Sequence, residues 1–230
     1  ITPMMEALLG GILPGAALVD GEAFLRAVRR PKSAADLHGI RTAVDVAEAC
    51  LAAAADAVAP GVTERTLLGR FESRMGQLGV TTPAFDAVAC VAGTTTRAMV
   101  SDRVLRTGDL VHLRGGVLVG GWQGVLARTR IVEGATGPQV AASERAAAAL
   151  GEAVAACRPG EVIGELRARP EVTALEGVGL GHEELADADV LAPDDVVYVE
   201  VLVDQVLLGD MVHVTDGGPQ ILTTAPLPIS

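Results

Sequence analysis

The sequence predicts an α+β fold with a mostly antiparallel sheet. An order of helix, Pro-Gly, second helix and then strands occurs at residues 31–119 and again at residues 138–214. The strand-like runs are separated by short Gly or Asp turns, which is typical of hairpins. The repeated order indicates an internal duplication, although no strong residue identity accompanies it.

The helices of the first half are marked by their ends. Residues 31–59 carry apolar side chains at helical spacing, with Pro31 at the start and Pro60-Gly61 as the stop, which predicts a long amphipathic helix. Thr63 then caps a second helix that runs to about Leu78 and ends at Gly79. The two helices are expected to form a helical hairpin.

The second half repeats these signals. Residues 138–158 predict an Ala-rich helix closed by Pro159-Gly160, and residues 161–168 predict a short helical piece. The expected strands share apolar, β-compatible composition bounded by turns. They fall at residues 83–91, 110–119, 122–132, 196–203, 205–215 and 220–223.

Composition excludes several classes of function. The chain has 18 basic and 29 acidic residues, a formal net charge of −11, which opposes binding to nucleic acid or to an anionic membrane. No apolar run approaches the roughly 18 residues of a membrane span. Cys50, Cys90 and Cys157 are odd in number and scattered, which argues against a disulfide framework and a structural zinc site. We therefore expect a cytoplasmic protein.

Five phrases resemble one known superfamily, in its order along the chain. They are RRPKSAADLHGIRTA, APGVTE, GDLVHLRGGVLVGGWQGVLART, GVGLGHEE and DMVHVTDGGPQILT. The superfamily contains methionine aminopeptidase, aminopeptidase P, prolidase and creatinase, and its fold is called pita-bread. The resemblance implies two pseudo-symmetric halves around a curved sheet over residues 29–230. Residues 1–28 resemble the linker that follows the amino-terminal domain of two-domain members, and that domain is expected to be absent.

The resemblance also implies that most of the metal ligands are lost. Active members hold two divalent cations between two Asp, one His and two Glu ligands, which generate a hydroxide and polarise a carbonyl. Matching the phrases places Arg114 at the first Asp, Val125 at the second Asp, Val178 at the His and Gly209 at the second Glu. Glu200 retains the first Glu. We therefore expect a degenerate member with no metal and no other cofactor.

Two further family residues are carried over by the same matching. The loop histidine that assists catalysis in the superfamily, and acts as acid and base in creatinases, corresponds to Arg97. A histidine that contacts substrate corresponds to His182, if about three residues are deleted after Gly181. The chain is therefore also expected to lack the histidine that acts as acid and base in creatinases.

Strand periodicity groups the remaining candidates. Residues two apart on a strand lie on the same face of the sheet. This places His112 beside Arg114 on one strand, Tyr198 beside Glu200 and Leu202 on a second, and Gly209 beside Met211 and His213 on a third. We expect Arg114 to pair with Glu200, either as part of a ligand site or as a structural plug. Glu200, His112 and His213 are candidate catalytic residues; Arg97, Arg114, Trp122, His182 and Tyr198 are candidate binding residues. Arg97 and Arg128 either bind an anion or are ordinary surface residues.

Three functions follow as hypotheses. The first is a peptidase-inactive pseudoenzyme that binds a small molecule, peptide or protein partner. The second is a metal-independent hydrolase or lyase acting on a small C–N or amide-like substrate with acid/base residues of the rebuilt pocket. The third is an ordinary metallo-aminopeptidase or prolidase, which would need new ligands. A homodimer is expected, because the apolar residues 4–19 are unfavourable on a monomer surface.

Overall fold

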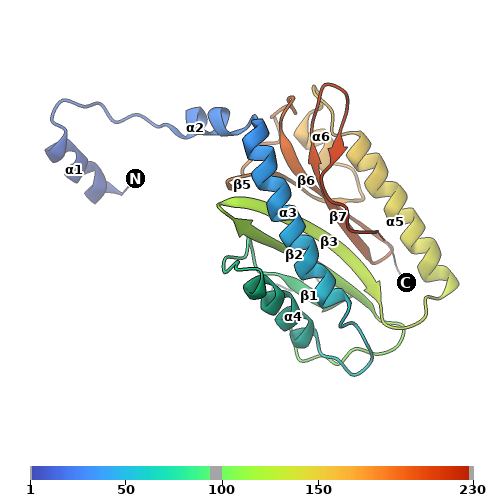
Figure 1. Ribbon diagram of the computed structural model, residues 1–230. Helices are drawn as coiled ribbons and strands as arrows, with labels where there is room; N and C mark the ends of the chain where they lie inside the picture. Colours follow the sequence, from blue (N-terminus) through green and yellow to red (C-terminus); the bar gives the residue numbers. More distant parts are fainter. Residues whose placement is uncertain (1, 94–99, 228–230) are drawn as a thin grey trace.

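The computed structural model describes residues 2–93 and 100–227, apart from the side chain of residue 182. A curved antiparallel sheet lies at its centre, and helices cover the outer face of the sheet (Figure 1). The helices are α1 (Pro3–Ile12), α2 (Glu22–Arg29), α3 (Ala34–Ala55), α4 (Glu64–Gln77), α5 (Gly137–Ala155) and α6 (Ile163–Arg167). The strands are β1 (Val88–Val91), β2 (Leu110–Val119), β3 (Trp122–Ile131), β4 (Val172–Gly179), β5 (Gly181–Glu183), β6 (Val196–Val203), β7 (Val206–His213) and β8 (Gln220–Ile221).

The sheet consists of two halves joined at one strand pair. Its order is β1-β2-β3-β7-β6-β4-β5, with β8 added to β7, and each pairing among these strands is antiparallel. The halves meet between β3 and β7, where Ala127 pairs with Gly209. Helices α3 and α4 lie over the first half and α5 over the second (Figure 1). The predicted α+β class and the repeated halves are confirmed.

The predicted helical hairpin is present, and its caps explain its bounds. Ser33 and Asp36 form a capping box, with 2.8 Å from the Ser33 amide to Asp36 Oδ2 and 3.3 Å for the reverse bond. The helix therefore begins after Ser33, three residues later than the periodicity predicts. Thr63 caps α4 as expected, accepting from the Thr66 amide at 3.2 Å.

Strands β4 and β5 were not among the predicted strands. The β4 sequence VTALEGVG contains two glycines and a glutamate, which lower its apparent β-propensity. It pairs with β6, which follows later in the chain at Val196–Val203, and forms a hairpin with the short β5. The turn between β4 and β5 is allowed because Gly181 adopts a φ of 78°. Tertiary pairing, not local propensity, therefore determines this part of the sheet.

Two large apolar clusters hold the helices on the sheet. One joins α3 and α4 to β1, β2 and β3, and the other joins α5 and α6 to β4, β6 and β7. In β6 the alternate residues Val197, Val199 and Val201 enter the second cluster. Tyr198 and Glu200 therefore face the inner side of the sheet, as the period of two predicts.

Residues 2–21 stand away from this body (Figure 1), and α2 lies at its edge beside Glu183. Helix α2 has no buried residue. The chain is anchored after α2, where Arg30 forms a bidentate contact with Asp195 and the buried Lys32 binds Glu183 at 2.8 Å. Among the described helices, none has the length and apolar character needed to cross a bilayer.

Candidate functional site

The strand pairing brings the predicted pair of charged residues together. Arg114 of β2 pairs with Ala127 of β3, Ala127 with Gly209 of β7, and Gly209 with Glu200 of β6. Glu200 in turn pairs with Ala174 of β4. These five residues thus form one row across five strands, on the inner face of the curved sheet. The curvature lets the long Arg114 side chain reach Glu200 across the row.

Glu200 is a buried carboxylate with a full set of partners. Its side chain accepts from the Tyr198 hydroxyl at 2.7 Å (Oε2) and from the Thr173 hydroxyl at 3.0 Å (Oε1). Arg114 Nε lies 2.8 Å from Oε2, so the expected ion pair is confirmed. Burial, and then the neighbouring Glu200, raise the pKa of Tyr198 well above its usual value. Tyr198 therefore stays protonated and donates to Glu200.

Arg114 is held between two aromatic rings. Its guanidinium carbon lies 4.3 Å from the centroid of Phe85 and 5.6 Å from that of Tyr198, within cation–π distance of both. Burial by itself would lower the pKa of Arg114, but the neighbouring oxygens of Tyr198 and Glu200 outweigh burial and raise it. The Nε hydrogen is not aligned for a hydrogen bond to Glu200 despite the short distance, so the contact is an ion pair. Arg114 is thus a permanent cation fixed in the site.

Tyr198 occupies the space that a side chain at position 209 would need. A Cβ atom built on Gly209 would lie 2.2 Å from the Tyr198 hydroxyl oxygen and 2.7 Å from Cζ. Such distances are far shorter than van der Waals contact. A glutamate at position 209, which the family ligand set requires, is therefore incompatible with the observed Tyr198 ring.

Apolar packing fills two more of the family's ligand positions. Val125 and Val178 are each 1% exposed and belong to a small cluster that includes Tyr198 and Met211. The Val125 amide lies 3.1 Å from Met211 Sδ. Neither valine side chain offers a lone pair, and a charged or polar ligand at either position would stand in an apolar cluster.

The residues present do not fit the two-metal centre of the family. Of the five matched positions, only Glu200 offers a ligand atom, and hydrogen bonds or the ion pair already engage both of its oxygens. The fixed guanidinium 2.8 Å away would repel a divalent cation. Within the described residues, no group of three or more His, Cys, Asp or Glu is arranged to hold a metal.

A cavity of about 470 Å³ lies beside the ion pair. Its size is within the range of small-molecule sites. Arg114, His112, Glu200 and Thr173 supply the polar part of its wall. The other described lining residues are Val88, Cys90, Gly93, Leu202, Gln205 and Leu207. The arrangement is mostly apolar, with a few polar groups gathered on one side.

His112 is oriented by a backbone carbonyl. Its Nε2 lies 2.7 Å from the carbonyl oxygen of Gln205, which can only accept, so Nε2 carries the hydrogen. Burial lowers the pKa of His112 below its usual value of 6.5 despite this bond. The ring is therefore neutral near pH 7 and its Nδ1 is an acceptor, for which the described part of the chain supplies no hydrogen-bond donor.

Several predicted site residues lie elsewhere or outside the described residues. His213 binds Asp194 at 3.1 Å, and it is four residues from Gly209 on β7, a distance of about 13 Å. Trp122 packs on α3, where its Cδ1 would lie 2.3 Å from a Cβ at Gly39. Neither residue is among the described lining residues of the cavity. Position 97 and the side chain of residue 182 lie outside the described residues.

Arg128 is not a surface residue, which corrects that interpretation. It is 6% exposed and donates to Asp210 Oδ1 at 2.7 Å and to the carbonyls of Ala127, Gly209, Ala225 and Pro226. Thr223 also donates to Asp210, at 2.6 Å. Arg128 therefore fixes the segment after β8 against the outer face of β3 and β7, and it has a structural role.

Three contributors to the site were missed from the sequence. Phe85 lies in the part of the predicted strand 83–91 that is irregular, since only Val88–Val91 forms β1, and Thr173 belongs to the unpredicted β4. Glu64, in the phrase APGVTE, is fully buried and accepts from the amides of Val91 and Ser101 at 2.9 and 3.1 Å. Its carboxylate thus joins the two flanks of residues 92–100, and a Glu in the first turn of a helix gave no sign of this role.

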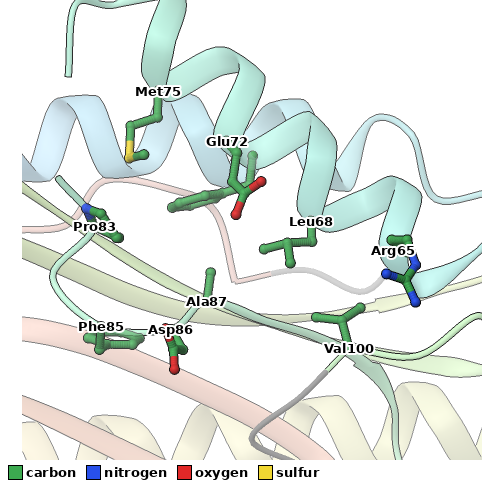
Figure 2. Close-up of a pocket in the computed structure, with 10 residues that line it drawn as sticks. Arg65, Leu68, Glu72, Met75, Pro83, Phe85, Asp86, Ala87 and Val100 are labelled. Atoms are coloured by element: carbon green, nitrogen blue, oxygen red, sulfur yellow. The ribbon is translucent and has the colours of Figure 1, made fainter. Parts of the chain in front are cut away.

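A second hollow of about 320 Å³ is also lined by Phe85 (Figure 2). Leu68 and Met75 of α4 face Pro83, Phe85 and Ala87 across it in that view. Glu72 and Asp86 are both exposed at this hollow. The Phe85 ring is therefore shared between this hollow and the Arg114 site.

Comparisons with known proteins agree with this architecture. A family profile described as metallopeptidase family M24 matches residues 38–184, more than half of the chain. A prolidase structure from Pyrococcus horikoshii superposes with a TM-score of 0.86 at 22% identity, covering 100% of this chain and 74% of that one. The Xaa-Pro dipeptidase from Bacillus anthracis superposes with a TM-score of 0.86 at 20% identity, and the X-Pro aminopeptidase from Thermotoga maritima with a TM-score of 0.85 at 17% identity. Each match covers 100% of this chain and 71% of the other. No curated protein sequence matches the chain. The expected fold is confirmed.

Proposed function

The chain belongs to metallopeptidase family M24 and has the pita-bread fold, and we propose that it is a peptidase-inactive member that binds a small organic ligand. The ligand occupies the cavity beside Arg114 and Glu200. The single observation that carries the proposal is the 2.8 Å contact between Arg114 Nε and Glu200 Oε2. It places a permanent cation next to the one retained carboxylate of the family's ligand set.

The absence of room for a replacement ligand supports the same proposal. A side chain at position 209 would overlap Tyr198, and Val125 and Val178 are packed in an apolar cluster. Restoring a metal centre would require several simultaneous changes in a closely packed interior. Peptide hydrolysis that depends on two metals is therefore not expected of this chain.

The cavity supports a binding role. Its volume of about 470 Å³ suits a small molecule, and its wall combines aliphatic side chains with a cluster of oriented polar groups. Glu200 and Arg114 satisfy each other, so the carboxylate carries no uncompensated charge when the cavity is empty of ligand. A pure plug would not need the accessible space that remains next to the pair.

One observation favours a second candidate, a metal-independent hydrolase or lyase. His112 is neutral, oriented through Nε2, and its Nδ1 is an acceptor at the cavity wall. A neutral imidazole held in one tautomer is suited to act as a general base. Turnover that persists with a chelator and is lost in Glu200→Gln would favour this candidate, whereas unchanged turnover in Glu200→Gln would refute its site.

The proposed function is tested by metal binding and hydrolysis measured together. Calorimetric titration with Mn²⁺, Co²⁺ and Zn²⁺ should give no stoichiometric binding, and Ala-Pro should not be cleaved in the presence of any of them. The prolidase of Pyrococcus furiosus, another structure with this fold, serves as the positive control under the same conditions. Binding of one or two ions per chain with metal-dependent cleavage would contradict the proposal.

We also propose that residues 1–28 take part in a homodimer. Apolar side chains of α1 and α2 are widely exposed, including Leu8, Ile12 and the 70% exposed Phe24. Exposed apolar groups gathered on one segment are typical of protein contacts. Sedimentation velocity should show a dimer that dissociates in the double variant Leu8→Glu and Ile12→Glu. A monomer at micromolar concentration would refute this part.

A further inference from the structure

We infer that the head group of the cavity's ligand is a neutral amide, such as a carboxamide or a lactam, attached to a compact apolar body. This inference rests on the proposed function, because it names the ligand class of the same cavity. It follows from three properties of the described wall: an acceptor at His112, a donor at Arg114, and an Arg114–Glu200 pair whose charges offset each other. The Thr173 hydroxyl and the Gln205 side chain are further polar groups of this wall.

His112 supplies the acceptor. Its Nε2 hydrogen is committed to the Gln205 carbonyl at 2.7 Å, so the neutral ring presents only a lone pair at Nδ1. Among the described residues no donor satisfies this atom, and His112 lines the cavity. A ligand N–H or O–H is the complementary group.

Arg114 supplies the donor. Its Nε edge faces Glu200, and its Nη2 lies 3.9 Å from Glu176 Oε1, which is beyond hydrogen-bond distance. The guanidinium thus forms ion pairs with Glu200 and, at longer range, with Glu176, and a ligand would use the N–H groups that these contacts leave; Arg114 also lines the cavity. A ligand oxygen that accepts hydrogen bonds is the complementary group.

The charges of the wall select a neutral head group. Arg114 and Glu200 cancel as a pair, and His112 is neutral. A ligand carboxylate would meet Arg114 but also Glu200 and, further out, the half-exposed Glu176. A ligand ammonium would meet the fixed guanidinium. Either charged group would lose hydration without gaining an unpaired partner, which is unfavourable in a mostly apolar site.

The two polar residues suit an amide. His112 and Arg114 are two residues apart on one face of β2, and both line the cavity. An amide carries both the N–H that the His112 acceptor needs and the oxygen that the Arg114 donor needs, so one group complements both residues.

The aliphatic side chains of the cavity wall indicate that the rest of the ligand is apolar. Val88, Leu202 and Leu207 lie on different strands around the cavity and offer aliphatic contact. A six-membered saturated ring fits the volume of about 470 Å³ with space to spare. We therefore expect affinity to come from apolar contact and selectivity to come from His112 and Arg114.

Three probes with one ring and different head groups test the inference. They are cyclohexanecarboxamide, cyclohexanecarboxylate and cyclohexylmethylamine, titrated into the full chain by calorimetry with ligand-observed NMR for weak binding. The carboxamide should bind at least tenfold more tightly than either charged probe. His112→Phe and Arg114→Met should each weaken carboxamide binding at least fivefold. His38→Phe and Arg41→Met, two matched changes at exposed positions of α3, should leave it unchanged.

The outcomes separate this inference from the proposed function. Equal or tighter binding of the carboxylate or the amine, or no binding of any probe, would overturn the amide inference. If a different compound then competes at the cavity, the proposed function still stands. Metal-dependent cleavage of Ala-Pro would instead overturn the proposed function itself. The comparison of head groups uses the unaltered chain, so the test does not depend on whether Arg114→Met folds.

Discussion

Replacing Gly209 by alanine tests whether the Tyr198 ring holds the space of a lost metal ligand. The new Cβ would lie 2.2 Å from the Tyr198 hydroxyl oxygen, 2.7 Å from Cζ and 2.9 Å from Cε2. Ordinary contacts need about 3.5 Å or more. The ring must therefore move by about 1 Å, although it is only 1% exposed and donates to Glu200 at 2.7 Å.

The expected cost has two parts. Overpacking a closely packed interior costs about 1–3 kcal/mol. Displacing the Tyr198 hydroxyl also weakens its bond to the Glu200 carboxylate, and a hydrogen bond to a charged group contributes about 1.5–3 kcal/mol. Because the ring can move without losing that bond completely, we expect Gly209→Ala to lower the free energy of unfolding by about 3 kcal/mol.

Equilibrium unfolding in urea measures this change directly. Gly69→Ala is the control, because Gly69 lies in α4 with no atom within 4 Å of a new Cβ, and it should stabilise the protein by about 0.5–1 kcal/mol. Combining Gly209→Ala with Tyr198→Leu should cost less than the sum of the two single changes. A cost for Gly209→Ala below about 0.5 kcal/mol would refute the reasoning.

Three further predictions concern buried groups. Burial lowers the pKa of His112 below 6.5 in the folded protein, so on acidification the unfolded chain binds a proton at His112 before the folded chain does. The free energy of unfolding should therefore fall as the pH drops below 6.5 toward the folded pKa. The drop in the free energy of unfolding between about pH 7.5 and about pH 5.5, measured with urea, should be smaller in His112→Gln than in the unaltered chain. The same drop in both proteins would contradict this prediction. Burial raises the pKa of Cys50 to about 11 and that of Cys157 to about 12, so both thiols should resist iodoacetamide in the folded protein at about pH 8, with a thiolate fraction of at most about 10⁻³. Rapid labelling of either thiol without unfolding, seen by peptide mass spectrometry, would exclude the described burial. Arg128→Met should lower the free energy of unfolding by about 3–5 kcal/mol, because it leaves Asp210 and several carbonyls unpaired, and a loss below about 1 kcal/mol in urea would show that the network is not structural.

Local patterns predicted much of the fold. The start and end of α4 follow from the Thr63 cap and from Gly79, and the β2–β3 hairpin follows from its Gly-Gly turn. The core of α3 was predicted, but the helix ends at Ala55, four residues earlier than expected from Pro60-Gly61. Strands β4 and β5 could not be predicted in this way. Their stability comes from pairing with each other and with β6, and their own residues have mixed propensity.

The candidate site was predicted in part. A period of two places Tyr198 and Glu200 on one face, and the charge of Arg114 made it the natural partner of Glu200, as the structure confirms. The same period could not show which residue of each strand belongs to the row of Arg114 and Glu200, because that depends on the register between strands, and His213 lies four residues along β7 from this row. Phe85 was not predicted, because its contact with Arg114 depends on how an irregular segment crosses the sheet. Pairing between strands is a tertiary property, and a one-dimensional pattern does not contain it.

Native mass spectrometry of the untagged chain, purified from its own host without chelator, tests whether the Arg114–Glu200 ion pair takes the place of the family's metal centre. We expect the mass of the chain with no stoichiometric metal and with one small organic compound retained in the native spectrum. One or two Mn, Co, Fe or Zn ions per chain would contradict this expectation.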